Sequence, residues 1–175
     1  NKRVVLLMCG SMGCGPIKDL AELLPQQLPE DAILVIICGN NVKLYRSLTK
    51  YPLPDNVRVI GFTSRMPLYM DAAELIMTKP GGLSTTEAAV KGLPMLFIDA
   101  VPGCETRNIE FFISNGCADM REGAIELCDA VCDYLEIPGM LSRMSQTLKN
   151  EFSGCAADII REYIVKDADC VYGRL

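Results

Sequence analysis

Histidine is absent from this chain of 175 residues. Without it, the chain cannot build a Ser-His-Asp triad, a Cys-His pair or a histidine-ligated zinc site. Any general base must be a carboxylate, a lysine, a tyrosine or a cysteine, or must come from another part of the protein. Several of the commonest catalytic sites are therefore excluded from the chain itself.

An excess of positive charge and long apolar runs are missing as well. Seventeen basic and 22 acidic residues leave a net charge of −5, whereas proteins that bind nucleic acid usually carry a basic patch or stripe. No apolar run approaches the roughly 18 residues of a membrane span, and no secretory signal is visible. We therefore expect no nucleic-acid partner and no membrane-spanning segment.

The composition is that of a folded core, with half of the residues hydrophobic and 22% charged. A length of 175 residues is typical of one domain. The first residue is Asn1 rather than Met, and a strand-like run follows almost at once. We therefore expect a single domain, residues 1–175, cut from a longer protein.

Nine cysteines are present, an odd number, and we interpret them as free thiols in a reducing cytosol. Cysteine in an apolar run behaves as a small hydrophobic residue. Cys128 and Cys132 are four residues apart and share a helix face, but no further ligand lies at zinc-finger spacing. We expect buried helix thiols rather than a metal site.

Short apolar runs recur along the chain and predict strands. They are continuous rather than alternating, which is typical of strands that helices cover on both faces of a parallel sheet. The predicted strands are Val4–Met8, Ala32–Ile37, Val57–Ile60, Leu75–Thr78, Met95–Ile98 and a weaker one at Cys117–Asp119.

Turn residues and then helical patterns follow several of these runs. The predicted helices include Ile17–Gln27, Val42–Lys50 and Ser84–Lys91, and the chain beyond about residue 122 is helical in pattern, with breaks at Pro138 and Gly154. Strand-to-strand spacings of about 20–30 residues suit βαβ units. The prediction is an α/β domain with a doubly wound, Rossmann-like parallel sheet, helices on both faces and a helical C-terminal end.

Ligands of such a sheet bind at the carboxyl ends of its strands, where three loops are of interest. The first, residues 9–15, contains Gly10, Ser11 and Gly13. Its glycines would let the backbone approach a phosphate. However, G-x-x-G-x-G departs from the dinucleotide fingerprint, and Pro16 stands where a P-loop needs lysine. A tight turn into a helix that begins at Pro16 is the alternative.

The second loop follows the fourth predicted strand. Lys79 and Pro80 lead to two glycines and three hydroxyl residues, namely Gly81, Gly82, Ser84, Thr85 and Thr86. Backbone N–H groups, hydroxyls and the positive end of a helix favour a phosphate here. Ser84 and Glu87 also fit an ordinary capping box. Two consecutive glycines exceed what a cap needs, which favours a ligand.

The third loop, residues 101–108, follows the fifth predicted strand. It combines a carboxylate, a cation and an amide in Glu105, Arg107 and Asn108. Carboxylates accept hydrogen bonds from two hydroxyls, and amides both donate and accept, so such groups bind sugars. The alternative is a solvated loop that Thr106 caps.

Together these loops resemble the C-terminal, donor-binding half of GT-B glycosyltransferases, in particular the processive diacylglycerol glucosyltransferases and monogalactosyldiacylglycerol synthases. The resemblance covers at least residues 3–165. It rests most firmly on residues 78–88, which read TKPGGLSTTEA. It also rests on Pro102-Gly103-Cys104-Glu105 with Asn108, and on Gly61-Phe62 with Met66, Met70 and Asp71-Ala72-Ala73.

The resemblance implies a role for each matching residue. Glu87 would bind the ribose hydroxyls, the backbone of Phe62 would meet the uracil edge, and Ser11 would border the phosphates or the uridine. The diphosphate would lie on Gly81, Gly82, Leu83, Ser84 and Thr85. Glu105 and Asn108 would read the sugar. Gly10, Gly13, Lys79 and Gly103 complete the candidate site. Cys104 stands where glutamine is usual, which leaves the choice of hexose open.

For the whole protein, the resemblance implies an inverting hexosyltransferase with a UDP-sugar donor and a diacylglycerol or glycosyl-diacylglycerol acceptor. An N-terminal half would hold the acceptor and supply the catalytic base, often a histidine. The chain alone would therefore hold no catalytic residue and be inactive. No cofactor and no metal are expected. The protein would be cytoplasmic and peripherally bound to the inner face of the membrane.

Two other functions stay open. The first is transfer of N-acetylglucosamine to the peptidoglycan lipid precursor. Enzymes of that family usually carry a Ser-Gly form where this chain has Lys79-Pro80-Gly81-Gly82. The second is a non-catalytic subunit that binds a nucleotide sugar and recruits a membrane partner.

Overall fold

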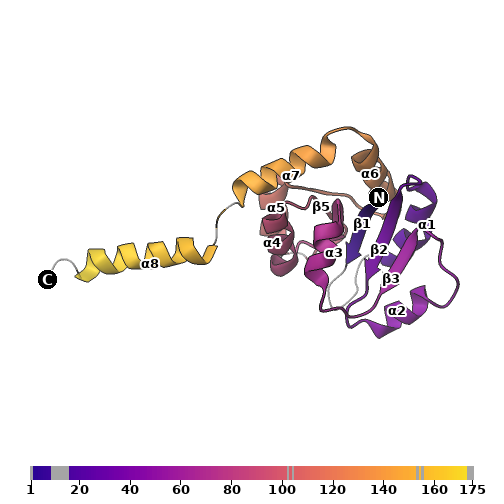
Figure 1. Ribbon diagram of the computed structural model, residues 1–175, viewed down its shortest axis with the longest axis horizontal. Coiled ribbons are helices and arrows are strands. Elements are labelled where there is room, and N and C mark those ends of the chain that lie inside the picture. The colour runs from indigo at the N-terminus through magenta and orange to yellow at the C-terminus, as the bar shows by residue number, and fades with distance from the viewer. Residues whose placement is uncertain are drawn as a thin grey trace.

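Six parallel strands form a sheet at the centre of the described part of the chain (Figure 1). The structure is a computed structural model that describes residues 2–8, 16–101, 103, 105–152, 154 and 156–172. The strands are β1 (Arg3–Met8), β2 (Ala32–Ile37), β3 (Val57–Ile60), β4 (Leu75–Thr78), β5 (Met95–Phe97) and β6 (Ala118–Met120). Their order is β3-β2-β1-β4-β5-β6, so the predicted doubly wound parallel sheet is confirmed.

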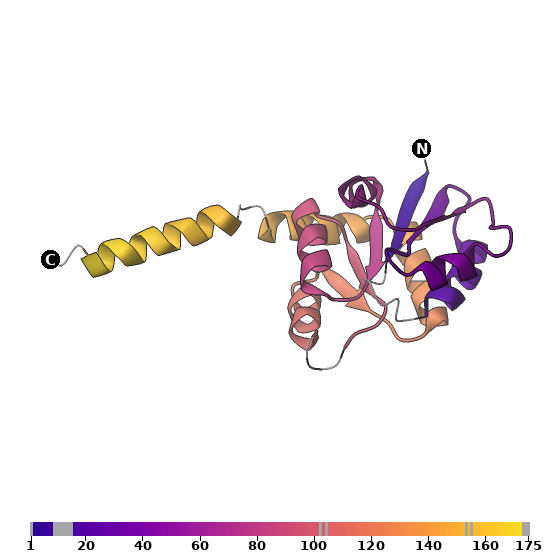
Figure 2. The same cartoon turned by 90° about the horizontal axis from the view of Figure 1, so that it is seen from below.

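Helices connect the strands and cover both faces of the sheet (Figure 2). They are α1 (Ile17–Gln27), α2 (Val42–Leu48), α3 (Met66–Ala72), α4 (Gly82–Lys91), α5 (Thr106–Ser114), α6 (Ala124–Glu136), α7 (Met140–Glu151) and α8 (Ala156–Tyr172). The predicted breaks at Pro138 and Gly154 are confirmed, because they lie between α6 and α7 and between α7 and α8.

Burial on both faces explains why the strands are continuously apolar. Val5 and Leu7 of β1 belong to a core cluster that includes residues of α1 and α6. Leu6, between them, belongs to a second cluster with residues of α4 and α5. Successive strand side chains point to opposite faces, so a strand covered on both sides needs an apolar residue at every position.

One predicted helix start was wrong. The helix α4 begins at Gly82 rather than Ser84, because the N–H of Thr85 already donates to the Gly81 carbonyl at 3.1 Å. Ser84 is thus the third residue of the helix, and the capping box with Glu87 is not formed. The predicted start of α1 at Ile17 is confirmed. Pro16 is the N-cap rather than the first residue of α1, as the alternative for the first loop had it, and its carbonyl accepts the N–H of Leu20 at 2.9 Å.

Four cysteines, Cys38, Cys117, Cys128 and Cys132, are free thiols. Cys128 is fully buried, as expected, whereas Cys132 is half-buried and its thiol donates to the Gln27 carbonyl at 3.5 Å. Burial raises the pKa of Cys38 and of Cys128 to about 11. These two thiols therefore stay protonated and unreactive near neutral pH.

The last helix, α8, extends away from the sheet in both ribbon views (Figures 1 and 2). It carries apolar side chains that face solvent, including Ile160, Ile164 and Tyr163, the last of which is 76% exposed. In the part of the chain that the structure describes, no helix is both long enough and apolar enough to cross a bilayer.

Candidate functional site

In the middle of the sheet, between β1 and β4, the order in which the chain adds strands reverses. β1 and β4 pair with each other, and the chain continues from β1 toward β2 and β3 on one side and from β4 toward β5 and β6 on the other. Open α/β sheets bind ligands beside the carboxyl ends of the strands at such a point. Gly10, Ser11 and Gly13 follow β1 but lie outside the described residues, so their roles remain predictions.

The start of α4 supplies backbone donors at this edge. Gly81 caps the helix with φ −73° and ψ 139°, and no side chain caps it. The first N–H bonded within the helix is that of Thr85. Within the described residues, the N–H groups of Gly82, Leu83 and Ser84 have no acceptor. Three free donors at the positive end of a ten-residue helix can bind an anion.

Thr85 uses its hydroxyl and its N–H within the first turn of α4. Its side chain is buried, and its hydroxyl donates to the carbonyls of Gly81 at 3.0 Å and Gly82 at 3.3 Å. Its N–H is also used, in the bond to Gly81. Thr85 thus presents no free donor to a ligand, and it holds the first turn of α4 in shape instead.

The fold does not require either glycine of this loop. Neither Gly81 nor Gly82 has a positive φ. A Cβ on Gly81 would lie 3.6 Å from an oxygen of Glu105, an ordinary contact, and a Cβ on Gly82 would meet nothing within 4 Å. Gly92, at the other end of α4, has φ +65°, and a Cβ there would lie 2.7 Å from Cγ of Lys149, so that side chain would have to move. Open space beside Gly82 is available to a ligand.

The β5–α5 loop lies against the β4–α4 loop. The Nδ2 of Asn108 donates to the Pro80 carbonyl at 2.8 Å. One carboxylate oxygen of Glu105 accepts the N–H of Val101 at 2.7 Å, and the other faces Gly81. The structure thus brings the predicted residues Gly81, Glu105 and Asn108 together. Gly103, with φ +84°, lies in the turn between Val101 and Glu105.

An ion pair joins the same two loops. Lys79 follows β4 and Asp99 follows β5, and their charged groups lie 3.2 Å apart. The Lys79 side chain is only 15% exposed, so its charge is engaged within the protein. Sequence reasoning missed Asp99, although its position directly beyond the fifth apolar run was an available signal. It also missed the Pro80 carbonyl as a hydrogen-bond acceptor.

Glu87 and Phe62 both face solvent. Glu87 is exposed on the second turn of α4, and Leu83, one turn earlier on the same helix face, is 83% exposed. Phe62 follows β3 and is 72% exposed. Three strand spacings separate β3 from β4, about 14 Å at 4.8 Å each. The candidate residues therefore extend along the carboxyl edge rather than surrounding one small pocket.

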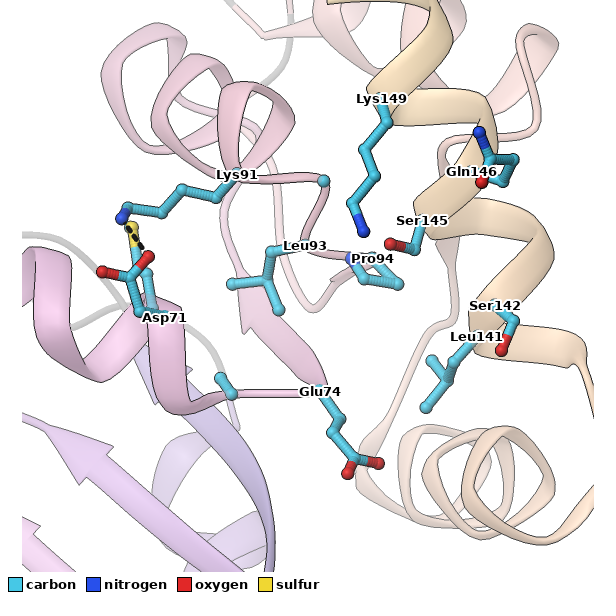
Figure 3. A pocket seen from close by; sticks show the side chains of 13 residues that line it. Asp71, Glu74, Lys91, Leu93, Pro94, Leu141, Ser142, Ser145, Gln146 and Lys149 are labelled. Carbon is cyan, nitrogen blue, oxygen red and sulfur yellow. Dashed lines mark hydrogen bonds and ion pairs between the residues drawn. The ribbon is translucent and has the colours of Figure 1, made fainter.

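A cavity of about 570 Å³ lies at the opposite edge of the sheet, where β4 and β5 begin (Figure 3). Glu74 and Pro94 line it from the strand side, and Ser145 and Lys149 line it from α7. Among the described residues of the predicted site, none lines this cavity. The predicted residues and this cavity are thus separate features of the fold.

Comparison with known proteins places the chain in a glycosyltransferase family. The glycosyltransferase family 28 C-terminal domain matches residues 4–102. A processive diacylglycerol beta-glucosyltransferase of Bacillus subtilis is 30% identical over 172 residues, which cover 97% of this chain and 44% of that protein. Its namesake in Staphylococcus aureus strain Newman is 33% identical over 153 residues, 83% of this chain and 39% of that protein. The chain thus spans less than half the length of these relatives.

Solved structures show the same fold. MurG of Acinetobacter baumannii superposes with a TM-score of 0.71 at 23% identity, covering 95% of this chain and 52% of that one. A spinosyn rhamnosyltransferase in complex with thymidine diphosphate gives 0.72 at 18% identity, covering 93% and 45%. The sheet and its helices therefore have the architecture of the C-terminal domain of a GT-B glycosyltransferase.

Proposed function

Because the chain belongs to glycosyltransferase family 28 and forms its C-terminal domain, we propose that it binds the UDP-sugar donor of an inverting hexosyltransferase. The acceptor is diacylglycerol or a glycosyl-diacylglycerol. The names of the Bacillus and Staphylococcus relatives, which match most of the chain, support this acceptor class. Those relatives are more than twice as long as the match, which leaves room for an acceptor groove and a catalytic base elsewhere in the protein.

One observation carries the proposal: two glycines that the fold does not need lie beside three N–H groups that have no acceptor among the described residues. Gly81 and Gly82 have neither positive φ nor a crowded Cβ position. When neither the backbone conformation nor the packing requires glycine, the close approach of a ligand to the backbone explains its presence. The adjoining donors and the helix dipole select a negatively charged group. A diphosphate meets both requirements, and the bound thymidine diphosphate of the spinosyn enzyme is such a ligand in the same fold.

The other predicted residues lie along the carboxyl edge of the sheet, beside the start of α4. The N–H groups of Gly82, Leu83 and Ser84 bind the diphosphate. Glu87, exposed on the same helix, accepts hydrogen bonds from both ribose hydroxyls, and the backbone of Phe62 meets the uracil. The sugar lies toward Glu105. These groups bind and orient the donor. The catalytic base that accepts the proton of the acceptor hydroxyl lies elsewhere in the protein.

Donor-binding residues and catalytic residues are thereby divided between two parts of the protein. Full-length protein is expected to transfer sugar at the inner membrane surface, through the acceptor half, while residues 1–175 alone bind UDP and transfer nothing. The domain needs no metal, because the helix start supplies the positive field that a metal would otherwise supply.

Calorimetric titration of the chain with UDP, UDP-glucose, UDP-galactose, UDP-N-acetylglucosamine, NAD and ATP tests this function. The proposal predicts binding of UDP and of a UDP-hexose, unaffected by EDTA. Preference for UDP-N-acetylglucosamine over both hexoses would instead favour the peptidoglycan-precursor enzyme. Binding of NAD or ATP but not of UDP would refute the proposal.

A further inference from the structure

The turn that leads into α4 is held by a residue from another loop. Pro80 is buried and lacks an N–H, so its carbonyl is the polar group that the turn must satisfy. Asn108, 28 residues away, donates to it at 2.8 Å. A carbonyl only accepts hydrogen bonds, so the amide nitrogen of Asn108 must face Pro80. One of the two amide N–H donors of Asn108 is therefore already used within the protein.

Asn108 is itself firmly placed. It lies in the first turn of α5, is half-buried, and its backbone N–H donates to the Glu105 carbonyl at 3.1 Å. Glu105 in turn accepts the N–H of Val101 at 2.7 Å. The side chain of Asn108 thus joins the start of α5 to the residue that precedes Gly81.

The turn needs such an outside restraint. Gly81 and Gly82 follow Pro80 directly, and glycine has more backbone freedom than any other residue. The orientation of the Pro80–Gly81 peptide decides where the N–H groups at the start of α4 point. A hydrogen bond that fixes the Pro80 carbonyl fixes this peptide before a ligand arrives, so the ligand does not have to order it.

We propose that Asn108 is a positioning residue, whose main role is to hold the Pro80–Gly82 turn ready for the donor diphosphate. Reading the sugar is the other role, which the family resemblance implies. This inference rests on the proposed function, because it takes the diphosphate to bind at the start of α4. The two roles differ in a measurable way. A positioning residue affects every ligand that contains the diphosphate, whereas a sugar-reading residue affects only ligands that carry the sugar.

The experiment compares UDP and UDP-glucose affinities of the wild-type chain, Asn108→Ala and Asn108→Leu, with Asn115→Ala as the matched control. Asn115 ends the same helix, and its amide donates to Phe111 at 2.7 Å. Loss of the Pro80 bond should weaken both ligands about three- to thirtyfold, as expected for one hydrogen bond and the order it maintains. The ratio of the two affinities should stay within about twofold of the wild-type ratio. Amide hydrogen exchange at Thr85, whose N–H donates to the Gly81 carbonyl, should become faster, while exchange in the sheet stays unchanged.

Each outcome decides a different question. A weaker affinity for UDP-glucose with an unchanged affinity for UDP would mean that Asn108 reads the sugar, and the inference would be wrong. Unchanged affinity for both ligands would also overturn it. A wild-type chain that does not bind UDP would refute the proposed function itself, which is measured first. Asn108→Leu preserves the side-chain size, so equal effects in both variants exclude a cavity as the cause.

Discussion

Replacing Gly82 with alanine separates ligand binding from folding. Gly82 is the first residue of α4 and has no positive φ, so alanine can adopt its conformation. The added methyl group would meet no atom within 4 Å. In a helix the Cα–Cβ bond tilts toward the N-terminus, which directs the methyl group toward the place proposed for the diphosphate.

The expected effect on stability is neutral or favourable. A glycine-to-alanine change at a compatible position stabilises a protein by about 0.4–1 kcal/mol, because the unfolded chain loses conformational freedom. For a protein of this size, 1 kcal/mol shifts the melting temperature by roughly 2–4 °C. Thermal unfolding of Gly82→Ala without ligand should therefore show a melting temperature equal to the wild type or a few degrees higher.

The expected effect on binding is opposite in sign. Hydrogen bonds to a charged group contribute about 1.5–3 kcal/mol each, and 1.4 kcal/mol corresponds to tenfold in affinity. A methyl group that keeps the phosphate from one N–H should weaken UDP binding roughly ten- to a hundredfold. Calorimetric titration of the variant with UDP measures this loss directly.

Gly92→Ala is the matched control at the other end of α4. Gly92 has φ +65°, and a Cβ there would lie 2.7 Å from Cγ of Lys149. The left-handed conformation costs about 1–2 kcal/mol for alanine, so this variant should be less stable yet bind UDP as the wild type does. If Gly82→Ala binds UDP with wild-type affinity, the reasoning from the unneeded glycines is refuted.

Further predictions concern a carboxylate, a buried phenol and two thiols. Glu87→Ala should change the free energy of unfolding by less than about 0.5 kcal/mol, because no capping box is formed, but weaken UDP binding about ten- to a hundredfold. Glu87→Gln should lose less UDP affinity. Equal UDP affinity of the wild-type chain and both variants would exclude the ribose contact. Tyr134 is buried and donates to Asp119 at 2.5 Å, so Tyr134→Phe should lower the free energy of unfolding by about 1.5–3 kcal/mol in denaturant titration. An unchanged midpoint would contradict this value. Iodoacetamide at pH 8, followed by peptide mass spectrometry, should leave Cys38 and Cys128 unmodified until the protein unfolds, because burial raises the pKa of both to about 11. Rapid modification of either in the native protein would be inconsistent with that burial.

The strands were predictable because their sequence signal is local. A strand buried on both faces has to be apolar at each position, and the runs at residues 32–37, 57–60 and 75–78 coincide with β2, β3 and β4. The start of α4 was less accessible. The pattern of Ser84 and Glu87 favours a cap, but the hydroxyl of Thr85 bonds back to Gly81 and Gly82, and the helix begins two residues earlier.

The candidate site was predictable as a set of loops but not in its internal contacts. Parallel strands place their carboxyl ends at one edge, so the loops around Gly81 and Glu105 were expected to meet. That the amide of Asn108 donates to the Pro80 carbonyl depends on a contact between residues 28 positions apart. No local pattern encodes such a contact. The same holds for the ion pair of Lys79 and Asp99, which depends on the pairing of β4 with β5.

The central claim, that the start of α4 holds a diphosphate, is tested most directly by titrating ¹⁵N-labelled protein with UDP and following the backbone amide signals. The account predicts that the largest shifts occur at Gly82, Leu83 and Ser84, whose N–H groups have no acceptor within the described residues. Small shifts are predicted at Gly92 and Lys149, beside the cavity at the opposite edge of the sheet. Shifts concentrated at that opposite edge, with residues 82–84 unmoved, would contradict the account.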